Sequence, residues 1–191
     1  MTRGPTLPAH HLPYLPKPLD AFNTAPADEA RALLLHCLHS PRWSDRIADH
    51  RPYPDPESLL AAADEAAYDL SPADLAEALA GEPLPELPED TYSAAHTALS
   101  AAHAAYEARF GHAFVIYLGD VPPGEVIDRI LEAIRSRLAN DPEEERVTAA
   151  EELRRLARGR LLVQLRGARP ASLCGCRHTG ATSHNAPATG R

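Results

Sequence analysis

The feature that most restricts how this chain can fold is a repeated helix-start signal, in which a polar residue is followed directly by proline. It occurs at Asp55-Pro56, Ser71-Pro72 and Asp141-Pro142, and Pro122-Pro123 is a related start. Ser and Asp side chains accept hydrogen bonds from the free N–H groups of a first helical turn, and proline fits that turn without losing a backbone bond. The sequence therefore predicts a series of helices with defined beginnings.

Apolar residues between these starts recur at helical spacing, and no pair of alternating strands is evident. We expect Asn23 or Thr24 to cap the first helix. Two sets carry the periodicity most clearly: Ala30, Leu33, Leu34, Cys37 and Leu38 early in the chain, and Val126, Ile127, Ile130, Leu131, Ile134 and Leu138 later. The sequence predicts an all-α fold, a single-domain helical bundle.

The two ends of the chain differ from its middle in composition. Residues 1–19 are rich in proline, and residues 167–191 are rich in Gly, Ser, Thr, Ala and Pro. Such segments bury too little apolar surface to fold, so we expect both to be disordered. The helical domain is then residues 20–166, which is long enough for one sizeable core.

The net charge of −8 is unevenly distributed. Residues 1–19 and 166–191 contain basic residues and no acidic ones, whereas the region between them has 13 basic against 27 acidic residues, a net charge of −14. A folded body of this sign is the opposite of what a nucleic-acid-binding protein needs. We expect no nucleic-acid partner.

Other sequence features argue against a membrane protein, a disulfide framework and a cofactor. No apolar run is long enough to form a signal peptide core or to cross a bilayer, so we expect a cytoplasmic protein. The three cysteines do not suggest a disulfide framework, and Cys174-Gly175-Cys176 with His178 lacks the ligand spacing of a zinc site. No phosphate-binding or dinucleotide-binding glycine pattern is present. We therefore predict no metal and no organic cofactor.

The run at residues 105–116 points to a pocket. An Ala-rich helical stretch ends at Phe110-Gly111, and Phe114, Val115 and Ile116 follow. Glycine commonly follows a helix end, and a connector this apolar must pack inward. An inward-packing connector at a helix terminus is suited to form a pocket wall.

This run, read as Tyr-x-x-Arg-Phe-Gly-x-x-Phe-Val-Ile, resembles a signature of the 2-oxo-4-hydroxy-4-carboxy-5-ureidoimidazoline (OHCU) decarboxylases of urate breakdown. A second stretch is similar to the same family, from Arg137-Leu138-x-Asn140 through Glu145 to Ala157-x-x-Arg160-Leu161. Weaker similarities occur upstream at Phe22-Asn23, at Ser40-Pro41-x-Trp43 and at Arg51-Pro52-Tyr53, so the resemblance covers roughly residues 20–165.

The resemblance implies a lyase that decarboxylates OHCU to (S)-allantoin in purine metabolism without a cofactor. Its partner would be the small ureido-imidazoline substrate, and a homodimer or a functional association with hydroxyisourate hydrolase or urate oxidase is left open. The resemblance also implies substrate-binding residues, namely Arg160, Phe110, Gly111, Phe114 and Ile116.

Arg160 stands out on residue-level grounds as well. It shares a predicted helix face with Leu153, Ala157 and Leu161, and a charge in that stripe needs an acidic partner, a ligand or water. A guanidinium can hold a carboxylate or a ureido oxygen through two parallel hydrogen bonds. The alternatives are that Arg160 reaches solvent from the helix end and that the 110–116 segment is only a packed connector.

One segment departs from the family pattern. The family has a His-Pro segment and then a Ser-x-x-Glu-Gln helix, whereas Glu82 stands here at the expected His and Ser93 is followed by His96. We predict that this chain has lost the family's acid/base segment, which leaves His112, Glu82 and His96 as catalytic candidates. His103, where the family usually has Asn, is expected to be a structural polar residue.

This departure keeps two other hypotheses open. In the first, the protein is a divergent, non-catalytic helical module that binds a purine-pathway enzyme or a ureide. In the second, it is a decarboxylase or isomerase of a related acid. Thermal stabilisation by allantoin helps to separate them, because an empty or remodelled pocket gives none.

Overall fold

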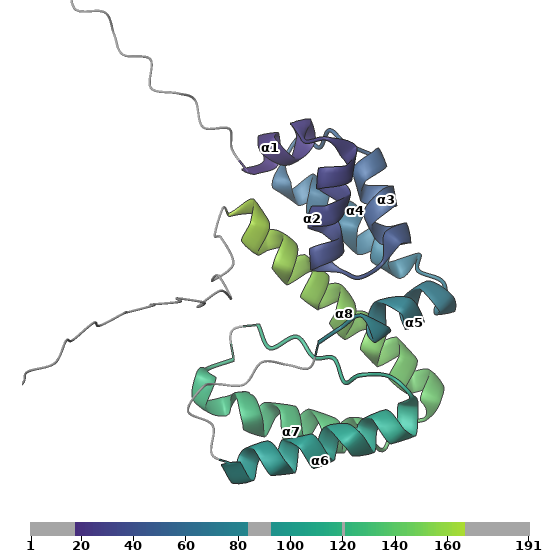
Figure 1. Cartoon of the computed structure of the whole chain (residues 1–191), viewed down its shortest axis with the longest axis vertical. Helices are drawn as coiled ribbons and strands as arrows, with labels where there is room; N and C mark the ends of the chain where they lie inside the picture. The colour runs from purple at the N-terminus through teal and green to yellow at the C-terminus, as the bar shows by residue number, and fades with distance from the viewer. Residues whose placement is uncertain (1–17, 84–92, 120, 167–191) are drawn as a thin grey trace, which may run out of the picture.

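The computed structural model describes residues 18–83, 93–119 and 121–166 of the chain. These ranges contain eight α-helices and one short 3-10 helix and no strand, which confirms the all-α prediction (Figure 1). The elements are α1 (Pro18–Thr24), α2 (Ala27–Cys37), α3 (Pro41–Asp49), α4 (Pro56–Tyr68), α5 (Pro72–Ala80), α6 (Ser93–Phe110), η1 (Pro123–Glu125), α7 (Val126–Arg137) and α8 (Pro142–Leu165).

The long helix α8 is the element around which the others are arranged. It contacts α1, α2 and α4, while α6 and α7 contact each other. Figure 1 shows α1–α4 gathered against the C-terminal half of α8 and the α6–α7 pair lying beyond its other half. The described helices therefore form two layers that α8 connects, and no helix among them is long and apolar enough to cross a membrane.

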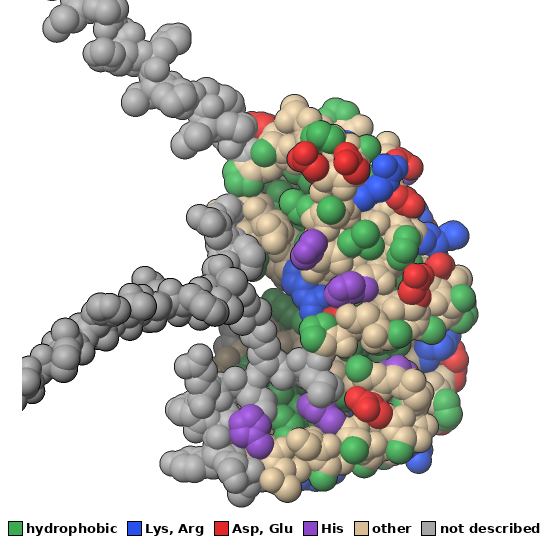
Figure 2. Space-filling model, viewed as in Figure 1, with side chains coloured by type: hydrophobic (Ala, Val, Ile, Leu, Met, Phe, Trp, Pro, Cys, Tyr) green, Lys and Arg blue, Asp and Glu red, His purple; other side chains and the backbone are tan. Residues whose placement is uncertain are grey.

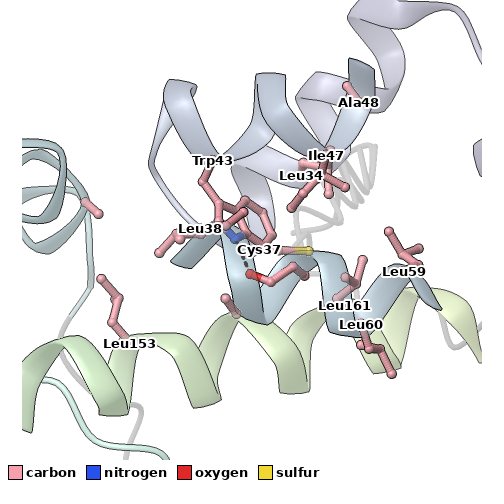
Figure 3. Packing of buried hydrophobic residues seen from close by; sticks show 14 of the residues in the cluster. Leu34, Cys37, Leu38, Trp43, Ile47, Ala48, Leu59, Leu60, Leu153 and Leu161 are labelled. Atoms are coloured by element: carbon pink, nitrogen blue, oxygen red, sulfur yellow. Dashed lines mark hydrogen bonds between the residues drawn. The ribbon is translucent and has the colours of Figure 1, made fainter. Parts of the chain in front are cut away.

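Each layer has its own apolar core. The larger core lies between α1–α5 and α8, around the buried Trp43, whose indole N–H donates to the Ala63 carbonyl at 2.9 Å (Figure 3). The smaller core lies between α6 and α7. Its buried residues are Leu99, Tyr106, Phe114, Ile116, Ile130 and Ile134.

The non-helical segment at residues 113–118 runs between these two cores. Phe114 and Ile116 belong to the smaller core, and Val115 between them belongs to the larger one. In an extended segment, successive side chains point to opposite sides. The predicted inward-packing connector is therefore present, and it contributes side chains to both layers.

A buried ion pair fixes this segment where α7 ends and α8 begins. Arg137 donates through Nε to Glu145 Oε1 at 2.8 Å and through Nη1 to the Val115 carbonyl at 2.6 Å. The Tyr106 hydroxyl donates to Glu145 Oε1, and the Asn140 amide donates to Glu145 Oε2 at 2.9 Å. One carboxylate thus connects α6, α7 and α8, and the arginine attaches the connector to them.

The predicted helix starts are largely confirmed. Asp55, Ser71 and Asp141 cap α4, α5 and α8, and each accepts hydrogen bonds from backbone N–H groups of the first turn. The predicted cap at Asn23 or Thr24 is wrong, because both residues lie inside α1, an additional helix. Asn23 instead pairs with the distant backbone of Tyr53, at 2.8 Å to its carbonyl and 2.9 Å from its N–H.

The predicted terminal segments fall almost entirely outside the described residues. α1 begins at Pro18, so the last two residues of the segment at 1–19 belong to a helix. The rest of that segment, and residues 167–191 with Cys174, Cys176 and His178, lie outside the described ranges.

We predict that Arg137→Leu lowers the free energy of unfolding by about 3–5 kcal/mol, because it leaves the Glu145 carboxylate buried without its cation. Urea denaturation followed by circular dichroism measures the change. The matched control is Arg129→Leu, which removes an exposed arginine of the same helix that pairs with Glu132 at 3.4 Å. Exposed pairs contribute little, so equal losses in the two variants would contradict this role for Arg137.

Candidate functional site

Arg160 on α8 forms a two-point ion pair with Glu82. Its Nη1 donates to Glu82 Oε1 at 2.9 Å and its Nη2 donates to Oε2 at 2.7 Å, while Nη1 also donates to the Cys37 carbonyl at 3.0 Å. The Glu82 side chain is 1% exposed and that of Arg160 is 31% exposed. The hydrogen bonds that Arg160 donates to Glu82 raise the pKa of Arg160, so the guanidinium remains charged.

Glu82 reaches Arg160 because the backbone at the end of α5 passes very close to His39. Gly81 follows α5, and a Cβ at this position would lie 2.6 Å from the His39 Cβ. Glycine therefore lets the chain pass directly against His39 and turn Glu82 toward α8. The His39 Nδ1 atom lies 3.8 Å from Glu82 Oε1, and its ring is half exposed.

A cavity of about 410 Å³ opens beside this ion pair. In the described part of the chain, Glu82 and Arg160 are the only charged residues in its lining. The lining residues are Glu82, Pro83, Phe114, Val115, Ile116, Tyr117, Leu118, Gly119, Leu156 and Arg160. Figure 2 shows the surface hollowed between the two layers, with hydrophobic side chains inside the hollow and basic atoms beside it.

The connector at residues 113–118 forms one wall of the cavity, and its position is fixed from several sides. The Tyr117 N–H donates to Glu152 Oε2 at 2.7 Å, and the ring of Tyr117 would lie 2.9 Å from a Cβ at Gly159 on α8. Among the described residues, no acceptor lies within hydrogen-bonding distance of the backbone N–H groups of Phe114 and Ile116.

The structure divides the residues that the sequence singled out between two cavities. Four of them line the cavity just described: Glu82, Phe114, Ile116 and Arg160. Three others line a second cavity of about 300 Å³ between α5 and the beginning of α8: Phe110, Gly111 and His112. His96 is exposed on α6 and lines neither. Glu82 is thus the one catalytic candidate that lies beside Arg160.

His112 is held away from the Arg160 cavity by its own local contacts. Its Nδ1 atom lies 3.0 Å from the Ala113 carbonyl, and its ring stands edge-on to Tyr106 at 5.5 Å between centroids. The backbone reverses at Gly111, whose φ of +76° is accessible to glycine without a steric penalty. This turn separates the residues before it from Phe114 and Ile116.

His103 on α6 is buried behind the cavity wall. It is 6% exposed, its ring stacks on Phe114 at 5.9 Å, and its Nε2 atom has no hydrogen-bond partner. Burial lowers the pKa of His103, an effect that the nearby Glu107 partly opposes, so the imidazole is neutral at pH 7. Within the described residues, it is the only buried side chain with such an unsatisfied polar atom.

Sequence reasoning does not assign two groups to this site, His39 and the backbone of Cys37. The His39 contact depends on the close approach at Gly81, which is a tertiary feature without a local pattern. Cys37 contributes its carbonyl rather than its thiol, and burial raises the pKa of that thiol to about 11. The thiol is therefore protonated and adds no charge to the cavity.

We predict that His103→Leu stabilises the protein by about 1 kcal/mol at pH 7.5, because it removes a buried, unsatisfied nitrogen. The difference in stability between this variant and the wild type should grow as the pH falls. The unfolded chain takes up a proton near the ordinary pKa of 6.5, whereas the native imidazole with its lowered pKa resists protonation, so the wild type loses stability below that pH.

Thermal unfolding of both proteins between pH 5 and 8 measures this difference, with the exposed His96→Gln variant as control. A melting-temperature difference that stays constant across this range would rule out the titration of His103 as its cause.

Comparison with known proteins places this cavity in a family fold. The family model described as OHCU decarboxylase matches residues 23–95 and 85–162. A crystal structure of (S)-allantoin synthase superposes with a TM-score of 0.64 at 19% identity, over 78% of this chain and 54% of that chain. A crystal structure of OHCU decarboxylase in the presence of (S)-allantoin gives 0.62 at 18% identity, over 74% of this chain and 99% of that chain.

No curated protein matches the chain in sequence. The chain spans about half the length of the allantoin synthase and nearly all of the decarboxylase. At these identities the two solved structures establish the shared fold, and the two matches of the family model together cover all residues from 23 to 162. The chain belongs to the OHCU decarboxylase family.

Proposed function

We propose that this protein decarboxylates OHCU to (S)-allantoin without a cofactor, in the breakdown of urate. The observation that carries the proposal is the composition of the Arg160 cavity. It combines one arginine with the apolar wall at residues 113–118, whose backbone N–H groups suit a ring made of amide and ureido groups. A volume of about 410 Å³ is in the range of small-molecule sites.

The chemistry requires two things of the cavity. Loss of CO₂ leaves an electron pair on a ring carbon, and this charge must be delocalised into a neighbouring carbonyl or imine that accepts hydrogen bonds. The backbone N–H groups of Phe114 and Ile116, for which the described residues offer no acceptor, are candidates for these donors. The carbon must then receive a proton on one face, which needs an acid at a fixed position.

Glu82 is the strongest candidate for that acid, since it lines the cavity beside Arg160. His112 and His96 remain catalytic candidates from the sequence, but the first lines the other cavity and the second is exposed. Phe110 and Gly111 likewise remain substrate-binding candidates only if the ligand extends toward that second cavity.

One observation favours the second hypothesis, a helical module that binds a ureide without catalysis. Glu82 occupies both terminal nitrogens of Arg160, so the resting cavity offers no open anion site. The family model also matches in two pieces that share residues 85–95, the region where the sequence departs from the family pattern.

Optical activity of the product distinguishes the two functions. Freshly oxidised urate is treated with hydroxyisourate hydrolase, and allantoin formation is followed by circular dichroism with and without this protein. We expect faster formation of a single enantiomer. Racemic allantoin at the spontaneous rate would reject the decarboxylase proposal and leave the ureide-binding module.

We predict that Arg160→Ala lowers the rate of this reaction by about 100-fold or more while the helical content stays unchanged. Arg160→Lys keeps the positive charge beside Glu82 but lacks the planar two-point geometry, so its rate should also fall, by about tenfold. Far-ultraviolet circular dichroism monitors the fold of both. The matched control is Arg155→Ala on an exposed face of α8, and a normal rate in Arg160→Ala would reject this site assignment.

A further inference from the structure

We propose that the Arg160 cavity binds a carboxylate together with one proton. In this exchange, which rests on the proposed function, the ligand's carboxylate replaces Glu82 on Arg160, and Glu82 becomes protonated. The expected ligand class is a ureido carboxylate with a single negative charge. The protonated Glu82 is then the proton donor of the decarboxylation.

The geometry of the ion pair requires an exchange. Glu82 uses both of its oxygens on Nη1 and Nη2 of Arg160, at 2.9 and 2.7 Å, and Nη1 also serves the Cys37 carbonyl. A second carboxylate can therefore make a two-point contact with this side of the guanidinium only if Glu82 moves away. Arg160 is 31% exposed, so an incoming anion can reach it.

The charges around Glu82 decide what happens after it moves. Two groups face it, Arg160 from α8 and His39 from the connection between α2 and α3, and Cys37 of α2 contacts Arg160 through its carbonyl. The Cys37 thiol is neutral, because burial raises its pKa to about 11. Within the described lining, Arg160 is the one cation, so a second carboxylate would leave two anions and one cation.

Two carboxylates that share a buried site do not both remain ionised. The side chain of Glu82 is 1% exposed, and an unpaired carboxylate in such a place costs several kcal/mol unless it takes up a proton. The ligand's carboxylate, paired with Arg160, stays charged, and Glu82 is the group that becomes neutral. Anion binding thus draws in one proton.

His39 gives this proton a path from solvent. Its ring is half exposed, and Nδ1 lies 3.8 Å from Glu82 Oε1, a gap that a small rotation or one bridging water closes. An imidazole can take up a proton on one ring nitrogen and release one from the other. His39 thus connects the buried carboxyl group to bulk water without being part of the cavity lining.

The proton then balances the reaction. The bond between the ring carbon and the ligand's carboxylate breaks, CO₂ leaves, and the electron pair stays on that carbon. The O–H bond of Glu82 breaks, and its proton forms the new C–H bond. Glu82 is again a carboxylate and pairs with Arg160, while the neutral product has no charge to compete for the guanidinium.

Calorimetry with a stable ligand tests this exchange independently of turnover. The probe is allantoate, a carboxylate with two ureido groups, and neutral allantoin is its matched control. Titrations at pH 7.5 in buffers with different ionisation enthalpies should show one proton taken up for each allantoate bound and none for allantoin. The dissociation constant for allantoate should rise up to about tenfold per pH unit above pH 7.5.

Variants identify the group that takes the proton. Glu82→Gln should bind allantoate about tenfold more tightly, with no proton uptake and no pH dependence, because no carboxylate has to be displaced. His39→Gln should still take up one proton at equilibrium, since His39 only relays it. The surface control Glu132→Gln should behave as the wild type.

The outcomes separate the exchange from the proposed function. Binding of allantoate without proton uptake in the wild type would overturn the exchange and leave the decarboxylase proposal intact. Proton uptake in a protein that forms only racemic allantoin would support the exchange and reject the decarboxylase. Failure to bind allantoate would overturn the exchange, whereas the optical activity of the product still decides the decarboxylase proposal.

Discussion

The cavity of this protein depends on a buried ion pair that does not line it, between Arg137 and Glu145. Their side chains are 8% and 0% exposed. Packing between helices alone would leave the α6–α7 layer weakly attached, since among the described elements its principal helix contacts are internal. Instead, Glu145 joins the two layers through Arg137, Tyr106 and Asn140, and Arg137 holds the Val115 carbonyl. The cavity wall is therefore held by this ion pair as well as by the packing of its side chains into both cores.

The two arginines Arg137 and Arg160 differ in their surroundings. Arg137 is almost fully buried, and all three of its nitrogens contact groups that belong to the fold. Exchanging any of these partners would separate the layers. Arg160 is partly exposed at a cavity, and its main partner is one side chain on the segment after α5. A partner of this kind can move without unfolding a helix, whereas the partners of Arg137 cannot.

The parts of this structure that the sequence predicted are those with local causes. The caps at Asp55, Ser71 and Asp141 depend on the next three residues alone, and they are present as expected. The sequence does not predict helix α1, because Asn23 looks like a cap and its actual partner, Tyr53, lies 30 positions away. In the same way, one contiguous motif was expected to form one site, but the turn at Gly111 sends its two halves to different cavities.

Glu82 and Arg160 also have to be considered as one unit. A glutamate that is 1% exposed would be strongly unfavourable without a cation, and Arg160 in its helix stripe would lack a partner without an acid. An acid at position 82 is tolerable because the guanidinium lies within hydrogen-bonding distance. The effects of substituting the two residues should therefore not add, since each one sets the electrostatic state of the other. This coupling, rather than either side chain alone, determines which charge the empty cavity presents to a ligand.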